Sequence, residues 1–159
     1  MAASQFTRVW LFAGVPVPDI PCRDGGYDRA VGGLGRPGGL EQGYYIRPTV
    51  FSNVRPGMTI EQEEIFGPVL VVLSYATEEE AIRIANGTPY GLGAYVFAGD
   101  LRKGYEVGSQ LRAGRVFLNG VPSNTAAPMG GYRHSGNGRE MGRFGLEEYL
   151  EVKAMFGFP

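Results

Sequence analysis

At 159 residues, with 43% hydrophobic and 19% charged residues, the chain has the composition of one globular domain. Lys and Arg number 15 against 16 Asp and Glu, and no segment concentrates either sign, which argues against nucleic-acid binding. No apolar run approaches the ~20 residues of a membrane span, and we expect no signal peptide. One cysteine, Cys22, and one histidine, His134, exclude a disulfide framework and argue against a His and Cys metal site, so we expect a cytoplasmic protein.

Residues 1–43 carry few signs of regular structure. VWLF is apolar, but PVPDIP suits neither a helix nor a strand ladder, because proline lacks the backbone donor that both require. RDGGYDRAVGGLGRPGGLEQG consists of turn-forming residues. We expect a loop or a poorly ordered arm here, with a packed element as the alternative.

Strand signals begin at Gly43. YYIRPTVFSNV predicts a strand interrupted at Pro48, and the proline favours a sheet edge. PGMTIEQEEIFG predicts a loop with a short helical turn. PVLVVLSY is a continuous apolar run, typical of a parallel strand that is covered on both faces.

Two helices and two further strands follow. Thr77 with Glu80 forms a capping box for a helix that ends at Asn86-Gly87. LGAYVFAGD predicts a strand, Asp100 caps a second helix that we expect to end at Gly114, and RVFLNGV predicts a third strand. This order predicts an α/β fold with a partial parallel sheet of βαβαβ type flanked by helices.

The C-terminal third begins with a long loop, PSNTAAPMGGYRHSGNGRE, which a compact domain usually keeps for function. EMGRFGLEEYLEVKAMF predicts a short helix that runs into a terminal strand. A sheet of so few strands gives a small core, so the chain has the pattern of part of a larger sheet.

Several motifs are open to more than one interpretation. GNGREMG has GxGxxxG spacing and follows a loop, so the context of a dinucleotide-binding turn is missing. Cys22 has no helix start beside it and is best interpreted as an unreactive thiol, and His134 as a solvated side chain without a catalytic partner. Glu64 could cap a turn and Phe66 could be a core residue, or both could form a binding site.

Six motifs together resemble the C-terminal part of an aldehyde dehydrogenase. They are PTVF, EEIFGPV, AIRIANGTPYGL, LRAGRVFLN, PMGGYRHSGNGREMG and GLEEYLEVK, in the order and at the intervals of that family. The resemblance covers about Gly32 to Phe156. It implies a non-family arm at residues 1–31, a partial catalytic domain at 32–147 and an oligomerisation strand at 148–159.

The resemblance implies roles for four residues. Glu64 corresponds to the acid that accepts hydrogen bonds from the nicotinamide ribose hydroxyls of NAD or NADP, and Phe66 to the aromatic residue beside the nicotinamide ring. Asn119 ends the strand that leads into the substrate-pocket loop. Met129 stands where many members carry a phenylalanine that lines the aldehyde tunnel, so the identity of the aldehyde is left open.

The family's reaction needs groups that these 159 residues do not contain. A cysteine thiolate in a Gly-Gln-x-Cys setting attacks the aldehyde, a glutamate after Leu-Gly-Gly activates water, and an asparagine amide stabilises the oxyanion. We therefore expect the chain alone to be inactive as an aldehyde dehydrogenase and not to bind its cofactor tightly. An independent hydrolase using Cys22 and His134, or a fold remnant without function, is a further alternative.

The C-terminal segment is predicted to be a strand that pairs with another protein chain. By the same resemblance, Glu148 to Phe156 extends the sheet of a second copy or of a full-length relative. This feature supports the alternative interpretation of the chain as a non-catalytic assembly module, because unpaired strand edges favour pairing.

Overall fold

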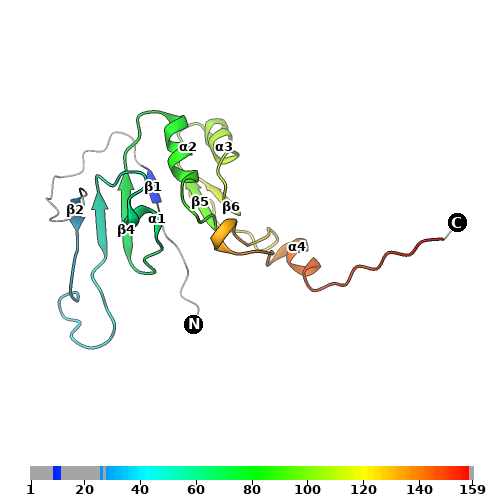
Figure 1. The fold of residues 1–159 in the computed structure, drawn as a ribbon, viewed down its shortest axis with the longest axis horizontal. Helices are drawn as coiled ribbons and strands as arrows, with labels where there is room; N and C mark the ends of the chain where they lie inside the picture. Colours follow the sequence, from blue (N-terminus) through cyan, green and yellow to red (C-terminus); the bar gives the residue numbers. More distant parts are fainter. Residues whose placement is uncertain (1–8, 12–25, 27, 158–159) are drawn as a thin grey trace. The chain divides into compact units, whose positions relative to one another are not determined.

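The chain divides into two compact units in the computed structural model, which describes residues 9–11, 26 and 28–157 (Figure 1). Unit 1 is Met1–Thr88, and unit 2 is Pro89–Pro159. Each unit has its own sheet. The division falls between the helix that follows the long apolar strand and the strand after it, so the predicted βαβαβ run is shared between the two units.

Unit 1 is built on a four-stranded sheet in the order β1-β4-β3-β2. Its strands are β1 (Val9–Leu11), β2 (Asp28–Val31), β3 (Thr49–Ser52) and β4 (Val69–Leu73). β4 is parallel to both β1 and β3, whereas β2 is antiparallel to β3. The apolar sequence of β4 agrees with its central place in the sheet: Val71 and Leu73 are buried, and the other three residues of the strand are half-buried.

Two expectations about the first fifty residues are wrong. β1 and β2 both belong to the sheet, although residues 1–43 were expected to form a loop or arm. β3 lies between β4 and β2 and is not an edge strand. Pro48 is compatible with this position because it precedes the ladder, where Thr49 N donates to Pro68 O at 2.9 Å.

The core of unit 1 lies between this sheet and its helices. Among the described residues, its buried apolar side chains are Val54, Val71, Leu73 and Ile84, of which Ile84 comes from α2 (Glu78–Asn86). A short helix, α1 (Thr59–Gln62), precedes β4 and contributes the half-buried Ile60.

The predicted start and end of α2 are confirmed. Thr77 Oγ1 accepts a hydrogen bond from Glu80 N at 3.2 Å, and Gly87 caps the other end. The Glu80 carboxylate accepts from Ala76 N at 2.8 Å, one residue before the cap. Both ends of this helix therefore follow from local sequence, because short polar side chains satisfy the free amides of a first turn.

Unit 2 contains a two-stranded parallel sheet covered by one helix. β5 (Gly93–Val96) pairs in register with β6 (Arg115–Leu118), and α3 (Leu101–Gly108) joins them as a crossover. A Cβ added to Gly108 would lie 3.2 Å from side-chain atoms of both Val116 and Leu118, so the helix packs closely on one face of the sheet.

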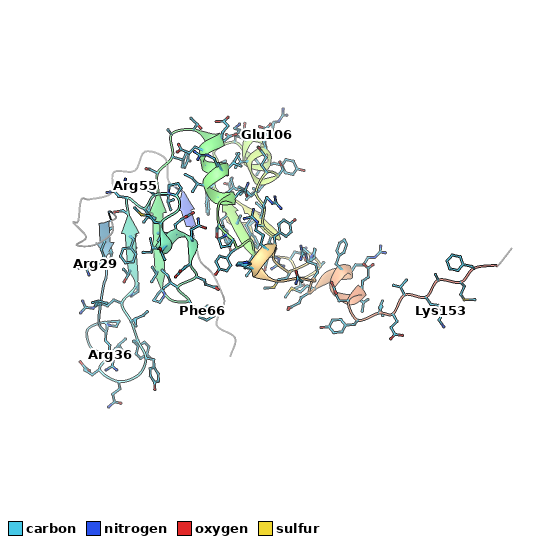
Figure 2. All side chains as sticks on the ribbon, viewed as in Figure 1. Arg29, Arg36, Arg55, Phe66, Glu106 and Lys153 are labelled. Atoms are coloured by element: carbon cyan, nitrogen blue, oxygen red, sulfur yellow. The ribbon has the colours of Figure 1, made fainter. Side chains whose placement is uncertain are left out.

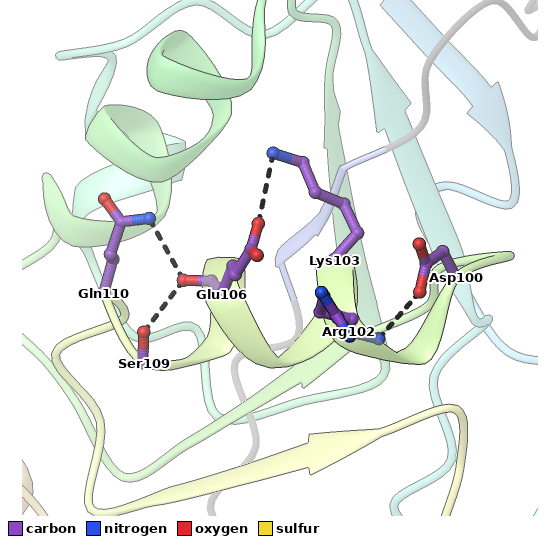
Figure 3. A network of polar contacts seen from close by, with 6 residues as sticks. All are labelled: Asp100, Arg102, Lys103, Glu106, Ser109 and Gln110. Atoms are coloured by element: carbon purple, nitrogen blue, oxygen red, sulfur yellow. Dashed lines mark hydrogen bonds and ion pairs between the residues drawn. The ribbon is translucent and has the colours of Figure 1, made fainter.

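Polar contacts organise both ends of α3 (Figure 3). Asp100 Oδ1 accepts from Arg102 N at 2.8 Å, which confirms the predicted cap. Lys103 and Glu106 form an ion pair at 3.7 Å on the exposed side. The helix ends at Gly108 and not at Gly114 as expected, because Gln110 N and Leu111 N bond to carbonyls three residues back and tighten the chain into turns.

The predicted α/β class with parallel pairing is confirmed, but the strands divide between two sheets. β4 pairs with β1 and β3, whereas β5 and β6 pair with each other. A pattern of strand and helix predicts the type of each element, but it contains no information on which strands become neighbours.

The chain after β6 contains a 3₁₀ turn, η1 (Arg133–Ser135), and a short helix, α4 (Gly142–Glu147). Residues 150–157 continue as an extended trace beyond α4 and pair with no strand of the described chain (Figure 1). The terminal strand therefore stays a prediction. Among the helices of the described part of the chain, none combines the length and apolar character needed to cross a membrane.

Candidate functional site

The segment Glu63 to Pro68 is anchored at both ends within unit 1. At its start, Glu63 N donates to Thr59 O at 2.9 Å and closes the last turn of α1. At its end, Pro68 O accepts from Thr49 N, which joins the segment to β3. The residues between these anchors are therefore positioned by the helix on one side and the sheet on the other.

Glu64 has a half-buried side chain in this segment. Its carboxylate has no hydrogen-bond or ion-pair partner among the described residues. The nearby Glu61 differs: it is only 3% exposed and accepts from Gly57 N at 3.1 Å and from the Gln62 amide. Glu61 is thus committed to the fold, whereas no described residue bonds either carboxylate oxygen of Glu64.

Phe66 adopts a left-handed backbone conformation with φ 55°. This conformation costs a non-glycine residue about 1–2 kcal/mol. The side chain is 58% exposed and projects from the turn before β4 (Figure 2). The interpretation of Phe66 as a core residue is therefore wrong, and its backbone geometry is of the kind found at ligand-binding positions.

Met129 lies in the long loop of unit 2, where two backbone hydrogen bonds pair it with Glu140. Met129 N donates to Glu140 O at 2.7 Å, and Glu140 N donates to Met129 O at 2.6 Å. The Met129 side chain is half-buried. A single pair of reciprocal bonds thus fixes the backbone that carries the predicted substrate-pocket residue.

Arg139 fastens the same loop and was not singled out from the sequence. Its Nη1 donates to Gly131 O at 3.1 Å and Gly138 O at 2.6 Å, and its guanidinium lies 5.5 Å from the Tyr132 ring centroid. Its backbone N donates to the Glu148 carboxylate at 3.1 Å. The sequence pattern that could have indicated this role is an arginine among closely spaced glycines. Glycines have no side chain to shield their carbonyl groups, so a long donor side chain can reach them.

Asn119 directly follows β6, also with a left-handed backbone, φ 49°. Its Oδ1 accepts from Ala98 N at 2.8 Å, and its Nδ2 donates to Ala98 O at 3.0 Å. Both ends of the amide therefore hold the chain after β6 against the chain after β5. The predicted place of Asn119 beside the substrate pocket stays a prediction, and the structure assigns its side chain these two bonds.

Cys22 and His134 were the other candidates for catalysis in the sequence, and both were interpreted as unreactive. Cys22 lies outside the described residues. His134 is exposed, with its ring edge-on to Tyr90 at 5.9 Å between centroids. Across residues 9–11, 26 and 28–157, no group of three or more His, Cys, Asp or Glu side chains is placed to hold a metal ion.

The predicted site residues thus divide between the units. Unit 1 holds Glu64 and Phe66 on one turn, and unit 2 holds Asn119 and Met129. Glu64 supplies a hydrogen-bond acceptor, Phe66 an aromatic ring and Met129 an apolar side chain, whereas both ends of the Asn119 amide are already bonded to Ala98. None of the four is a nucleophile.

The aldehyde dehydrogenase family model matches residues 22–155. A similar curated protein is 3-succinoylsemialdehyde-pyridine dehydrogenase from a Pseudomonas species, 55% identical over 127 residues. That alignment covers 80% of this chain and 27% of the relative, so the chain spans about a quarter of the relative's length.

Solved structures agree with the sequence match. Aldehyde dehydrogenase C of Pseudomonas syringae, a variant in complex with NAD+ and octanal, superposes with a TM-score of 0.81 at 55% identity, over 84% of this chain and 28% of that one. An aldehyde dehydrogenase of Mycobacterium tuberculosis in complex with NAD+ gives 0.77 at 44% identity, over 84% and 28%. Since the family model covers most of the sequence and the fold agrees, the chain belongs to the aldehyde dehydrogenase family.

Proposed function

We propose that this chain supplies one side of the binding site of an NAD-dependent aldehyde dehydrogenase. Glu64 and Phe66 bind the nicotinamide end of the cofactor, and Met129 borders the pocket for the aldehyde. The observation that carries this proposal is the turn before β4, where an available carboxylate and an exposed ring stand two residues apart. The related structures in complex with NAD+ support the choice of cofactor.

The residues present fit a nicotinamide riboside. The two oxygens of the Glu64 carboxylate can accept two hydroxyl hydrogen bonds, and bonds to an ionised acceptor are among the stronger ones. The Phe66 ring offers a flat apolar surface to the nicotinamide ring. When bound, NAD+ would take up the hydride that leaves the substrate, and the chain's own contribution is to orient the acceptor ring.

The chain alone is proposed to be inactive, because its sequence lacks the Gly-Gln-x-Cys motif and the water-activating glutamate. Reduced-nicotinamide formation by the purified chain, with NAD+ or NADP+ and a panel of aldehydes that includes octanal, tests this. We expect no turnover by the chain or by its Cys22→Ser variant. Turnover that Cys22→Ser abolishes would show that Cys22 is the nucleophile and would contradict the proposal.

A chimaera tests the roles of Glu64 and Phe66 directly. In it, residues 22–155 of this chain replace the matching part of the Pseudomonas syringae enzyme. Because Glu64→Gln loses charge-assisted bonds to the ribose, and each such bond is worth ~1.5–3 kcal/mol, we expect KM for NAD+ to rise about tenfold or more. Glu63→Gln, at the exposed neighbouring residue, is the matched control. Equal effects of Glu64→Gln and Glu63→Gln would contradict the assignment.

The C-terminal segment supports a second candidate function, as a non-catalytic assembly module. After the turn that ends α4, the chain is extended and carries exposed apolar side chains at Leu150, Val152, Met155 and Phe156. Such a segment can add a strand to the open sheet edge of a second copy or of a full-length relative.

Sedimentation across a concentration series tests this second candidate. We expect self-association, weakened by Val152→Asp and unaffected by Lys153→Gln, because a charge on an apolar strand face resists burial. A monomer at all concentrations, together with no binding to a full-length relative, would exclude the assembly function.

A further inference from the structure

Glu61 is a buried carboxylate that the proposed cofactor contacts do not use. It is 3% exposed, and among the residues that the structure describes it is the one ionisable side chain that is buried. No described cation forms an ion pair with it. A carboxylate taken out of water is costly unless hydrogen bonds replace its hydration, and an apolar residue would fill the same space at less cost. The role of Glu61 therefore lies in the bonds that it makes.

The Glu61 carboxylate connects the loop before α1 to the end of that helix. Its Oε2 accepts from Gly57 N, two residues before the helix begins, at 3.1 Å. The same oxygen accepts from the side-chain amide of Gln62, the last residue of α1. Gln62 Nε2 also donates to Gly87 O at 3.3 Å, at the C-terminal cap of α2. A continuous chain of hydrogen bonds thus runs from the loop before α1, through Glu61 and Gln62, to the end of α2.

α1 has little stability of its own. It is a single turn of four residues, and Met58, which precedes it, provides no side-chain cap. A helix so short is unstable in isolation, because the first turn fixes several dihedral angles for few hydrogen bonds. The bonds of Glu61 and Gln62, together with the packing of Ile60 against the core, supply the fixed points that the helix backbone lacks.

The turn that carries Glu64 and Phe66 begins where α1 ends. Glu63 N donates to Thr59 O and closes the helix, and Glu64 is the next residue of the chain. The other anchor of the turn lies beyond Phe66, at Pro68 O. A shift of α1 is therefore passed directly to Glu64, and then to the left-handed backbone of Phe66.

We propose that Glu61 is a positioning residue for the nicotinamide end of the cofactor. It contacts neither the ribose nor the ring, and acts by holding α1 so that the Glu64 carboxylate and the Phe66 ring keep one arrangement. Binding groups have to be held to within about 0.5 Å, and buried hydrogen bonds behind them are the usual means. This inference rests on the proposed function, since Glu64 and Phe66 are the groups that contact the cofactor.

Equilibrium binding of NAD+ to the chimaera described above tests this role without turnover. Glu61→Leu removes both bonds of the carboxylate and keeps an apolar side chain in its place. We expect it to raise the Kd for NAD+, measured by isothermal titration calorimetry, about tenfold, and Glu61→Gln, which keeps an acceptor oxygen, to raise it less. Thr77→Ala is the matched control, because it removes the cap of α2 in the same unit without touching the bonds of α1, and it is expected to leave this Kd unchanged.

A double-mutant cycle separates positioning from a general loss of structure. In a chimaera with both Glu64→Gln and Phe66→Leu, the two cofactor contacts are already lost, so adding Glu61→Leu is expected to change the Kd less than about twofold. A general loosening of the fold would raise the Kd by the same factor in both backgrounds. That result would overturn the proposal.

Hydrogen exchange in the 159-residue chain gives a readout that needs no cofactor. The Glu63 amide, which closes α1, is expected to exchange several-fold faster in Glu61→Leu, while the Thr49 amide keeps its protection. Gln62→Leu leaves the carboxylate in place but breaks its connection to Gly87, and it is expected to give the same changes in smaller measure. This variant decides the question if Glu61→Leu does not fold. Unchanged exchange at Glu63 in the folded variants would overturn the proposal.

The outcomes separate this inference from the proposed function. If Glu64→Gln and Phe66→Leu leave the Kd for NAD+ unchanged, the proposed function is wrong, and Glu61 positions no cofactor contact. If those two variants weaken binding but Glu61→Leu and Gln62→Leu do not, the proposed function stands and the role of Glu61 alone is wrong.

Discussion

Gly114→Ala is expected to disrupt the loop that carries Met129. Gly114 stands immediately before β6, where its N donates to Gly91 O at 3.0 Å. A Cβ at this position would lie 2.8 Å from the carbonyl carbon of Gly130, and the carbonyl oxygen would be closer still. Both neighbours are backbone atoms, so no side-chain rotation can relieve the overlap, and the loop at Gly130 has to move away from β6.

The magnitude follows from two opposing terms. Overpacking against rigid neighbours costs ~1–3 kcal/mol and sometimes more. Replacing glycine by alanine recovers ~0.4–1 kcal/mol, because the unfolded chain loses conformational freedom. Because the overlap is with backbone atoms, the first term lies at the upper end of its range, and we expect a net loss of about 2 kcal/mol in the free energy of unfolding, a factor of about 30 in the folded-to-unfolded ratio.

Hydrogen exchange and urea unfolding together measure this effect. Urea unfolding followed by circular dichroism gives the free energy of unfolding. Exchange at the amides of Met129 and Glu140, which form the reciprocal bonds of the loop, reports the local change. We expect both amides to exchange faster in Gly114→Ala, while the amides of unit 1 keep their protection.

Gly99→Ala is the matched control. A Cβ at Gly99 would meet no atom within 4 Å, and its backbone is not left-handed. It is expected to leave stability unchanged or to raise it by up to ~1 kcal/mol. If Gly114→Ala behaved like Gly99→Ala, the close approach of β6 and the Met129 loop would not exist, and the geometry assigned to this half of the site would be refuted.

Three further predictions concern residues with strained backbones or caps. Phe66→Gly should be about 1 kcal/mol more stable than Phe66→Ala in urea unfolding, because only glycine relieves the left-handed conformation; equal stabilities would contradict it. Asn119→Ala should lose about 2 kcal/mol through its two bonds to Ala98, and Asn119→Gly less, because glycine relieves the left-handed backbone; no loss in either variant in thermal unfolding would show that the two bonds do not stabilise the fold. Thr77→Ala should destabilise α2 by ~1 kcal/mol, which would be measured as faster hydrogen exchange of the Glu80 amide. Unchanged exchange would show that the Thr77 hydroxyl does not stabilise the helix.

Local signals in the sequence predicted the elements well. The apolar run of β4 and the caps at Thr77 and Asp100 were identified correctly, since each depends on residues within one turn or one strand. The end of α3 was missed because several glycines compete as stop signals over Gly104 to Gly114. The chain leaves the helix after Gly108, which packs closely against Val116 and Leu118 of β6.

Pairing between distant segments was not predictable from the same signals. β1 has only three residues and β2 only four, and both lie in sequence that is otherwise rich in turns. Their strand structure depends on hydrogen bonds from β4 and β3, which no short window contains. The same limit explains why the division of the strands into two sheets escaped prediction.

The candidate site could be located from the motifs, but its geometry could not. The resemblance identified Glu64 and Phe66, whereas the left-handed backbone of Phe66 and the availability of the Glu64 carboxylate emerged from the structure. Arg139 was missed because its side-chain partners are backbone carbonyls, which every residue has, so an arginine among glycines is only a weak signal in the sequence.

Each half of the site owes its geometry to contacts inside its own unit. The turn with Glu64 and Phe66 is attached to Thr59 and Thr49, both in unit 1. The Met129 loop is attached through Arg139 and Glu140 within unit 2. Because neither half needs the other for its local structure, the binding groups can persist in a chain whose sequence lacks the family's nucleophile motif. What the 159 residues are proposed to retain is therefore the means to orient a cofactor and a substrate, whereas the covalent chemistry would need groups that this sequence does not contain.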